Sequence, residues 1–169
     1  AEVTSKTGLG TAGPLLFGGC GLTIKPGAPG FARLDRIPVT PDHRLVMGTF
    51  RPYPTKVMLS SNKKRAQINE WGRKTLEKIL IKPSLKNFMA SCKEYTLQTG
   101  FATERVKQLM EFAENAGAIG AAQNMLGEAV HALVIDNNAE AVYDAFRKVL
   151  PEEKIIVSGI DFQGARIIG

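Results

Sequence analysis

Residues 129–158, which read AVHALVIDNNAEAVYDAFRKVLPEEKIIVS, hold the pattern that decides the fold. The first seven of these residues form an apolar run of a length typical of a buried strand. Residues 139–150 follow with apolar side chains at helical spacing, among them Val142 and Phe146. Residues 154–158 contain three consecutive β-branched apolar residues, Ile155, Ile156 and Val157, and favour a second strand. The stretch therefore predicts a strand, a helix and a strand in succession.

Further short apolar runs extend this pattern toward both ends of the chain. Residues 164–168 are expected to form a strand that pairs with residues 154–158 across a short connection. Residues 18–24 and 45–50 are apolar and bounded by proline and glycine, which is typical of strands. Because strands and helices are mixed without a regular strand-helix-strand repeat, the chain is expected to have an α+β fold.

Three successive helices are predicted in the middle of the chain. A serine or threonine precedes each helix as an N-cap, and a proline or glycine follows it. These bounding positions are Ser61 and Pro83, Ser84 and Gly100, and Thr103 and Gly117. Between the third helix and the strand that begins at residue 129, residues 118–127 are expected to form a turn of small residues.

The composition of the 169 residues is that of a protein able to bury its own core, since 44% of them are hydrophobic. The two cysteines, Cys20 and Cys92, have no metal-ligand spacing, and a reducing, cytoplasmic setting is expected. The longest apolar runs, such as residues 129–135, are far too short to span a bilayer. No signal-peptide pattern is seen, so no membrane partner is expected.

The net charge of +6 is concentrated in one region. Residues 42–82 hold ten lysines and arginines against three aspartates and glutamates. This surplus fits either a phosphate-bearing partner or the solvated face of the helix that follows Ser61, and the helix face is favoured. Nucleic acid is disfavoured as the partner, because Trp71 is the only aromatic residue in that helix.

Glycines are dense near the N-terminus, where residues 8–30 contain eight of the chain's 17. Glycine is the residue that lets a backbone approach a ligand or adopt a positive φ. Gly8 and Gly10 bound one turn, and Gly117 and Gly120 bound another. Each turn fits a phosphate-binding loop whose backbone N–H groups face an anion, and each also fits an ordinary turn or helix C-cap.

Only a few polar residues are candidates for chemistry. Glu2 has a carboxylate suited to Mg²⁺ beside a polyphosphate. Thr55 and Lys56 would place a hydroxyl and an ammonium group at a substrate site, or belong to an ordinary turn. The two histidines, His43 and His131, have no spacing typical of a metal site, and His131 is expected in the core. No P-loop, dinucleotide-binding or serine-hydrolase motif is present.

Six short motifs occur in a specific order along the chain. They are residues 1–3 (AEV), 6–10 (KTGLG), 17–19 (FGG), 24–30 (IKPGAPG), 35–38 (DRIP) and 121–127 (AAQNMLG). Taken together, they resemble the archaeal pantoate kinase family, which is part of the GHMP superfamily of small-molecule kinases. The resemblance covers most of residues 1–135 and corresponds to the C-terminal part of such an enzyme.

This resemblance implies a domain organisation. Residues 1–52 would end the N-terminal, ribosomal-protein-like catalytic domain, and residues 53–169 would form the ferredoxin-like C-terminal α+β domain. The ATP loop of the family would lie in an N-terminal segment of the same enzyme that this chain does not include. We therefore expect the chain by itself to be inactive and to need that segment as a partner, and we leave open that the enzyme also forms a homodimer.

The resemblance also implies a reaction. ATP and Mg²⁺ would be the cofactors, and the primary hydroxyl of pantoate would be phosphorylated in coenzyme A biosynthesis. Glu2 matches the metal-binding glutamate of the family, the turn at Gly8 and Gly10 matches a cofactor-binding motif, and Gly117 and Gly120 match the third glycine motif.

Thr11 is the main departure from the family pattern. The family has an aspartate at this position, which orients or deprotonates the acceptor hydroxyl. Threonine cannot act as that base, so the catalytic role at this position differs. Pantothenate as the acceptor, or a binding domain without catalysis, are the alternatives that this substitution leaves open.

Overall fold

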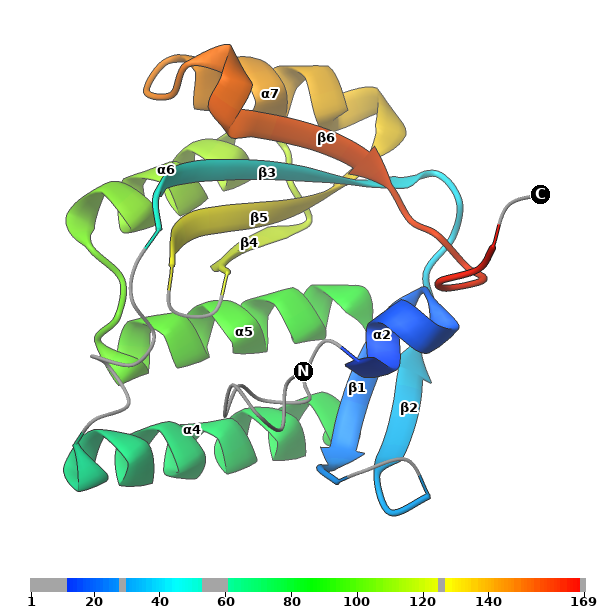
Figure 1. Cartoon of the computed structure of the whole chain (residues 1–169). Coiled ribbons are helices and arrows are strands. Elements are labelled where there is room, and N and C mark those ends of the chain that lie inside the picture. Colours follow the sequence, from blue (N-terminus) through cyan, green and yellow to red (C-terminus); the bar gives the residue numbers. More distant parts are fainter. Residues whose placement is uncertain (1–11, 28–29, 53–60, 125–126, 168–169) are drawn as a thin grey trace. The chain divides into compact units, whose positions relative to one another are not determined.

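The computed structural model describes residues 12–27, 30–52, 61–124 and 127–167, without the side chains of residues 12–14 (Figure 1). By its internal contacts the chain divides into two compact units. Ala1–Thr40 and Ile160–Gly169 form the first, here called the ribbon unit, and Pro41–Gly159 form the second, here called the sheet unit. Each unit is described by itself.

The sheet unit has a four-stranded antiparallel sheet in the order β4-β5-β3-β6. Its elements along the chain are β3 (His43–Arg51), α4 (Asn62–Ile81), α5 (Leu85–Thr99), α6 (Glu104–Asn115), β4 (Gly120–Gln123), β5 (Glu128–Ile135), α7 (Ala139–Arg147) and β6 (Ile155–Gly159). Without the α4–α5 pair, this order is β-α-β-β-α-β, which is the ferredoxin-like arrangement. The expected α+β class is confirmed, and the α4–α5 helix pair is inserted between β3 and α6.

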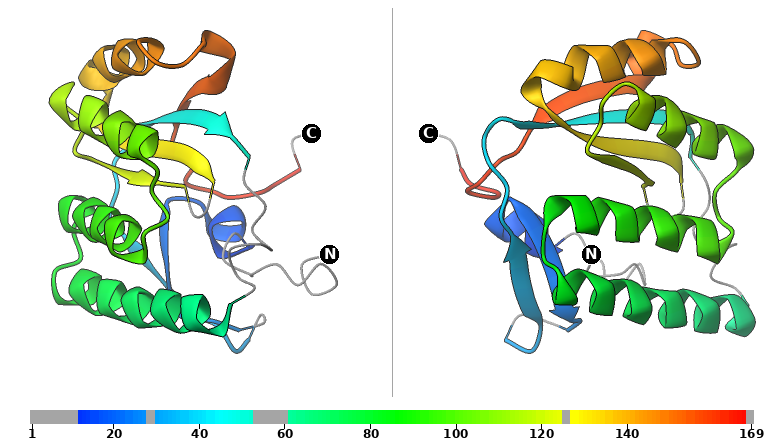
Figure 2. Two further views of the ribbon diagram at one scale, coloured as in Figure 1. Left: turned by 90° about the vertical axis from the view of Figure 1, so that its left-hand side faces the viewer. Right: turned by 180° about the vertical axis from the view of Figure 1, so that it is seen from behind.

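One face of this sheet carries the main core of the unit. Val46 of β3 and Val130 of β5 are fully buried against Leu109 of α6 and Phe146 of α7. The views in Figures 1 and 2 show α6 and α7 lying along the sheet, with α5 next to β4 and α4 beyond α5. Met89 of α5 packs on the opposite face of the sheet, which is where a second, smaller core forms.

The helices of the sheet unit begin and end largely as their sequence predicts. The Ser84 hydroxyl accepts a hydrogen bond from the Asn87 backbone N–H (3.3 Å), so it is the N-cap of α5. Gly100 ends α5 in the left-handed conformation at φ 70°, which favours glycine over every other residue. Ser61 occupies the N-cap position of α4, but its side chain makes no capping bond, so that part of the expectation is wrong.

Helix α4 has a mostly solvated surface, as its charge pattern predicts. Only Ile79 of its residues is buried, and its lysines and arginines are exposed. Two of its lysines pair with carboxylates, Lys74 with Glu70 and Lys78 with Glu94, both at 2.6 Å. No helix in the described part of the chain has the length and apolar character needed to cross a membrane.

The ribbon unit has one short helix and a two-stranded antiparallel ribbon. Helix α2 (Ala12–Phe17) precedes β1 (Cys20–Lys25), which pairs with β2 (Arg33–Ile37). The last part of the chain joins this unit through backbone hydrogen bonds. The Gly19 N–H donates to the Asp161 carbonyl oxygen (2.7 Å), and the Ala165 N–H donates to the Leu15 carbonyl oxygen (2.6 Å).

The expectation of a strand at residues 164–168 is wrong, because the structure has no strand at residues 164–167. The Asp161 carboxylate instead accepts the backbone N–H groups of Gln163 and Gly164, both at 2.8 Å, and bends the chain into a turn. Gly164 then takes a φ of 77° beside the Leu16 carbonyl group. The Ala165 N–H, which a hairpin would have used, instead donates to the Leu15 carbonyl oxygen of α2.

Several further elements in the described ranges were not expected from the sequence, among them two short 3₁₀ helices, Asp136–Asn138 and Glu152–Lys154. Strand β4 occupies part of the predicted small-residue turn at residues 118–127, and α2 and β2 also form where no element was predicted. The unit division differs from the expected domain boundary too, since β3 pairs with β5 and β6 although it precedes residue 52. The assignment of domains at residues 1–52 and 53–169 stays a prediction.

Candidate functional site

Most of the site residues predicted from the sequence fall outside the part of the chain that the structure describes. They are Glu2, Gly8, Gly10, Thr11, Thr55 and Lys56. Gly117 and Gly120 lie within the described residues, both in the sheet unit. The structure therefore gives the surroundings of two of the eight candidates.

Gly117 lies just after α6 and has a φ of 95°, a conformation that side chains rarely tolerate. Its N–H donates to the Glu114 carbonyl oxygen (3.0 Å), and its own carbonyl oxygen accepts the Asn138 side-chain N–H (2.9 Å). A Cβ at this position would lie 2.8 Å from Asn138 Nδ2. The helix end thus accounts for a glycine here, and a role toward a nucleotide stays a prediction.

Gly120 is buried at the start of β4 and faces helix α5. A Cβ at this position would lie 2.6 Å from the Cβ of Met89, a distance that real Cβ atoms do not adopt. The close approach of α5 to β4 therefore requires a residue without a side chain. This packing accounts for the glycine, and its cofactor role also stays a prediction.

A groove of about 300 Å³ runs beside Gly120 on the exposed flank of α5. Its charged lining residues are two lysines and two glutamates: Lys86, Lys93, Glu94 and Glu114. Lys93 is already paired with Glu114 at 2.6 Å. Because the charges of the lining cancel, the groove offers little attraction to a phosphate group.

No metal centre is formed within the described ranges, since no three histidine, cysteine, aspartate or glutamate residues there are placed to hold an ion. His131 lies in β5, where burial lowers the pKa of its imidazole. Its Nδ1 is buried and makes no hydrogen bond to any residue that the structure describes. Burial therefore favours the neutral form of this imidazole.

A buried carboxylate at one end of the sheet was missed by sequence reasoning. Glu128, the first residue of β5, is 3% exposed and is held by Arg105 of α6 and Arg51 of β3. Arg105 Nε donates to Glu128 Oε1 at 3.0 Å, and its guanidinium also contacts Oε2. The Arg105 guanidinium carbon lies 4.9 Å from the centre of the Phe50 ring. The cluster ties together the end of β3 and the beginnings of α6 and β5.

The electrostatics of this cluster follow from those contacts. Hydrogen bonds from Arg105 lower the pKa of Glu128 to about 2, with Arg51 and the Thr103 hydroxyl adding to the effect against the opposing effect of burial. The carboxylate therefore remains charged far below neutral pH. The three charged residues are 23 to 77 positions apart in the sequence, and no local pattern connects them.

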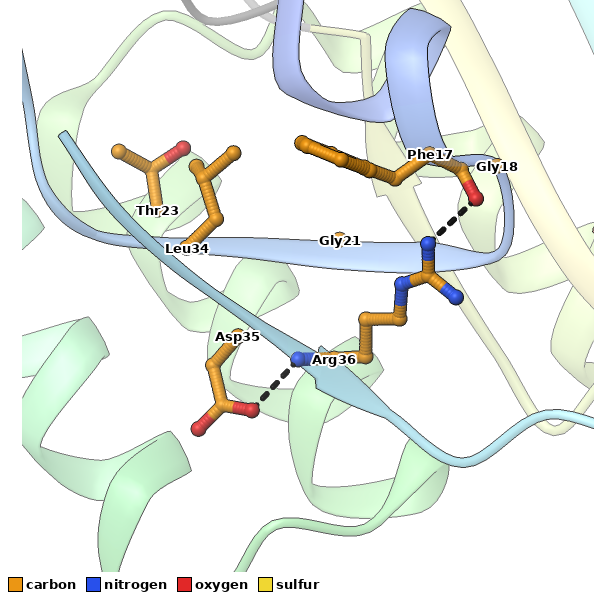
Figure 3. A pocket seen from close by; sticks show the side chains of 7 residues that line it. All are labelled: Phe17, Gly18, Gly21, Thr23, Leu34, Asp35 and Arg36. Atoms are coloured by element: carbon orange, nitrogen blue, oxygen red, sulfur yellow. Dashed lines mark hydrogen bonds between the residues drawn. The ribbon is translucent and has the colours of Figure 1, made fainter. Parts of the chain in front are cut away.

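The ribbon unit contains a cavity of about 340 Å³, which Figure 3 shows at close range. It is lined by Phe17, Gly18, Gly21, Thr23, Leu34, Asp35 and Arg36. Phe17 and Gly18 belong to the motif at residues 17–19, and Asp35 and Arg36 belong to the motif at residues 35–38. The fold thus brings two of the separate motifs that carry the family resemblance to one pocket.

Arg36 crosses from the ribbon to the end of α2 at this pocket. Its Nη2 donates to the Phe17 carbonyl oxygen (2.6 Å), and its guanidinium carbon is 5.8 Å from the centre of the Phe17 ring. Asp35 is directed the other way in Figure 3, where its carboxylate accepts the Arg36 backbone N–H (2.8 Å). The pocket therefore combines an aromatic wall with a cationic group.

Comparison with solved structures shows which proteins share this fold. A structure described as a "Phosphotransferase related to CoA biosynthesis pathway" superposes with a TM-score of 0.76 at 25% identity, over 98% of this chain and 52% of that one. Mevalonate diphosphate decarboxylase from Staphylococcus aureus gives 0.64 at 16% identity, over 95% of this chain and 57% of that one. Homoserine kinase from Cytophaga hutchinsonii gives 0.62 at 17% identity, over 92% and 53%. The chain has the α+β fold of the GHMP small-molecule kinases.

Within that class, the sequence is similar to the archaeal pantoate kinases. It is 29% identical to the enzyme of Methanocaldococcus jannaschii over 127 residues, which are 75% of this chain, and 29% identical to that of Thermococcus kodakarensis over 140 residues, which are 83%. Each match covers 46% of the relative, so the chain spans about half the length of the curated relatives it matches. The matched half is their C-terminal part, as the sequence predicts. No protein-family model matches the chain.

Proposed function

We propose that the chain is part of an ATP-dependent kinase that phosphorylates the primary hydroxyl of pantoate in coenzyme A biosynthesis. The observation that carries this proposal is the similarity to two pantoate kinases across most of the chain. The structural similarity to a phosphotransferase of coenzyme A biosynthesis supports the same reaction. The enzyme would be a phosphotransferase with an alcohol as acceptor.

The residues proposed for this site keep the roles that the resemblance gives them. ATP would supply the phosphoryl group, and Mg²⁺ would neutralise its charge. Glu2 would hold the metal ion, and the backbone N–H groups at Gly8 and Gly10 would face the phosphates. Thr11 would donate or accept a hydrogen bond at the acceptor hydroxyl and so position it without removing its proton.

Thr55 and Lys56 are proposed to lie on the acceptor side of the site. Gly117 and Gly120 are proposed to shape the cleft rather than bind a ligand, since contacts with Asn138 and Met89 already account for both glycines. We further propose that the N-terminal part of the enzyme, which contains the ATP loop in the family, completes the site. A homodimer and a cytoplasmic location belong to the same proposal.

A coupled phosphate-transfer assay tests the proposed function. The chain is joined to an N-terminal segment corresponding to the remaining part of its relatives and is assayed with pantoate and with pantothenate. We expect pantoate to be phosphorylated by the joined enzyme and not by the chain alone. Turnover by the chain alone, or no turnover by the joined enzyme, would contradict the proposal.

The substitution Thr11→Asp makes the test more specific. An aspartate accepts a proton that threonine cannot accept, so kcat of the joined enzyme is expected to rise about tenfold or more. Thr4→Asp adds the same charge seven positions earlier in the sequence and is the matched control, with kcat expected to stay within about twofold. If kcat is unchanged in Thr11→Asp, residue 11 takes no part in the catalytic step.

A binding domain without catalysis is the second candidate, and Thr11 is the observation that favours it. Calorimetry with ATP and Mg²⁺ on the joined protein separates the two functions when it is combined with the assay. Nucleotide binding without turnover of either acceptor would support the binding domain. Turnover of pantothenate in preference to pantoate would instead identify the acceptor as the pantothenate alternative.

A further inference from the structure

The pocket of the ribbon unit has its apolar and cationic groups on one face of the ribbon. The register pairs Thr23 with Leu34 and Gly21 with Arg36, so these residues share a face, since directly opposite residues of antiparallel strands do so. The Phe17 ring, which is 49% exposed, stands over the same face (Figure 3). The result is an apolar surface at one end of the pocket and a guanidinium group at the other.

Arg36 is in no ion pair among the described residues, although the Asp35 carboxylate also lines the pocket. In the described part of the chain, its guanidinium bonds to the neutral carbonyl of Phe17 and to no carboxylate. Asp35, its neighbour in β2, points to the opposite face because side chains alternate along a strand. A guanidinium has five N–H donors, and one of them is used here. The remaining donors are suited to an anionic ligand.

The size of the pocket limits what that ligand can be. A volume of about 340 Å³ lies at the small end of the range for small-molecule sites, which is roughly 300 to 1,000 Å³. A nucleotide needs more room and a site for several phosphates. A small acid with an apolar part matches both the volume and the division between Arg36 and the surface made by Phe17 and Leu34.

We propose that this pocket binds a short, branched hydroxy acid, with its carboxylate on Arg36 and its alkyl groups on Phe17 and Leu34. The Thr23 hydroxyl bonds a hydroxyl of the ligand. This assignment rests on the proposed function, because pantoate is an acid of this kind, with two methyl groups beside its hydroxyls and carboxylate. Helix α2, which begins directly after Thr11 in the sequence and ends at Phe17, links the pocket to that position along the chain.

The guanidinium group gives this recognition its selectivity. Its planar pair of N–H donors matches the two oxygens of a carboxylate, whereas an ammonium group acts as a single point charge. The bond from Arg36 to the Phe17 carbonyl fixes the guanidinium beside the ring, so little side-chain freedom is lost on binding. A lysine at position 36 keeps the charge but not this geometry.

Calorimetric titration of the 169-residue chain with pantoate tests the assignment. Arg36→Gln is expected to weaken binding about tenfold or more, and Arg36→Lys about threefold to fivefold, because the charge remains. Arg33→Gln is the matched control: Arg33 is exposed on the same strand, outside the pocket, and its loss is expected to change Kd less than about twofold. Circular dichroism of each variant checks that the fold is kept.

A neutral probe separates the carboxylate contact from apolar binding. Pantoyl lactone has no carboxylate, so its binding is expected to be the same in the wild type and in Arg36→Gln. Phe17→Ala is expected to weaken both ligands about fivefold or more, since both use the apolar wall. No pantoate binding by the wild-type chain, or equal pantoate binding in Arg36→Gln and Arg33→Gln, would overturn the assignment.

The joined enzyme distinguishes this inference from the proposed function. Arg36→Gln is expected to raise the KM for pantoate about tenfold and to leave the KM for ATP unchanged. If pantoate is phosphorylated and its KM does not depend on Arg36, the pocket assignment fails and the kinase function stands. If the chain binds pantoate through Arg36 but the joined enzyme transfers no phosphate, the pocket stands and the kinase function fails.

Discussion

The sheet unit and the ribbon unit differ in how they use their apolar residues. In the sheet unit, strands and helices from residues 43–159 enclose fully buried side chains such as Val46, Leu109 and Phe146. In the described part of the ribbon unit, Leu22 and Ile37 are the buried hydrophobic residues, whereas Phe17 and Leu34 are exposed. The first unit is stabilised by side-chain packing, and the second depends on backbone hydrogen bonds and glycine geometry.

This difference bears on how stable each unit is by itself. A two-stranded ribbon is at best marginally stable by itself in water, because one pair of strands cannot bury enough apolar surface. The ribbon unit adds one short helix and the C-terminal residues, which bond to it through Gly19 and Ala165. Phe17 and Leu34 therefore remain available to a ligand or to further polypeptide, whereas the sheet unit encloses a core of fully buried side chains and leaves others, such as Ile81 and Ile156, exposed.

The largest expected effect tests the packing side of this comparison. Phe146→Ala removes a fully buried ring and should lower the free energy of unfolding by about 4 kcal/mol. Phe17→Ala is the matched control, because its ring is half exposed, and should cost less than about 1 kcal/mol. Urea unfolding followed by far-UV circular dichroism measures both. Equal losses in the two variants would contradict the contrast between the units.

The buried carboxylate of the sheet unit gives the next largest effect. Glu128→Gln leaves two arginines without their shared anion and should lower the free energy of unfolding by about 3 kcal/mol at pH 7. Glu111→Gln, an exposed glutamate of α6, should change it by less than about 0.5 kcal/mol. Chemical denaturation at fixed ionic strength measures both variants.

The lowered pKa of Glu128 also predicts how the free energy of unfolding changes with pH. Its pKa falls from an ordinary 4.5 to about 2 in the folded protein, so the stabilisation is present above pH 4.5 and is lost as the pH falls toward 2. Glu128→Gln should therefore lose less stability between pH 5 and pH 2 than the wild type. If the free energy of unfolding fell equally in both proteins between pH 5 and pH 2, the role given to this cluster would be contradicted.

The glycine geometry of the ribbon unit predicts a smaller effect. A Cβ at Gly18, where φ is 65°, would lie 2.5 Å from the Asp161 carbonyl oxygen, so Gly18→Ala should cost about 2 kcal/mol. At Gly19 φ is 70° but no atom lies within 4 Å of such a Cβ, so Gly19→Ala should cost about 1 kcal/mol. Amide hydrogen exchange at Ala165 should accelerate in Gly18→Ala and much less in Gly19→Ala. The reverse order would contradict this account of the ribbon unit.

The smallest expected effect concerns the N-caps of α4 and α5, the two helices of the inserted pair. Ser84→Ala removes the hydroxyl that caps α5 and should lower the free energy of unfolding by about 1 kcal/mol. Ser61→Ala removes a side chain that makes no capping bond and should change it by only a few tenths of a kcal/mol. Thermal unfolding is sensitive enough for this pair. A larger loss at position 61 would show that the α4 cap forms in solution.

The sheet unit could largely be predicted because its sequence patterns and its packing agree. The apolar stripe of α6, which includes Val106 and Leu109, is fully buried, and the run at residues 129–135 forms most of β5. Strand β4 could not be predicted, because Gly120 and the two alanines after it resemble a turn. Only the contact of α5 with Gly120 shows why such small residues belong in a strand.

The ribbon unit and the sites were harder to predict, since they depend on contacts distant in sequence. Strand β2 has polar residues on both sides and is mostly exposed, so it lacks the alternation that identifies a strand. The cluster at Glu128 needs two arginines from other elements, which no local spacing reveals. The pocket at Arg36 depends in the same way on the register of β1 with β2.

The return of residues 160–167 to the ribbon unit also sets an order of events during synthesis. A ribosome releases the chain from its N-terminus, so residues 1–40 emerge long before their partner residues at the other end. The sheet unit is formed by one continuous stretch of sequence, Pro41–Gly159, and can fold first. The ribbon of β1 and β2 gains its contacts with the turn at Asp161 only after residues 160–167 have been synthesised. Until residues 160–167 have emerged, the exposed Phe17 and Leu34 would be accessible to chaperones.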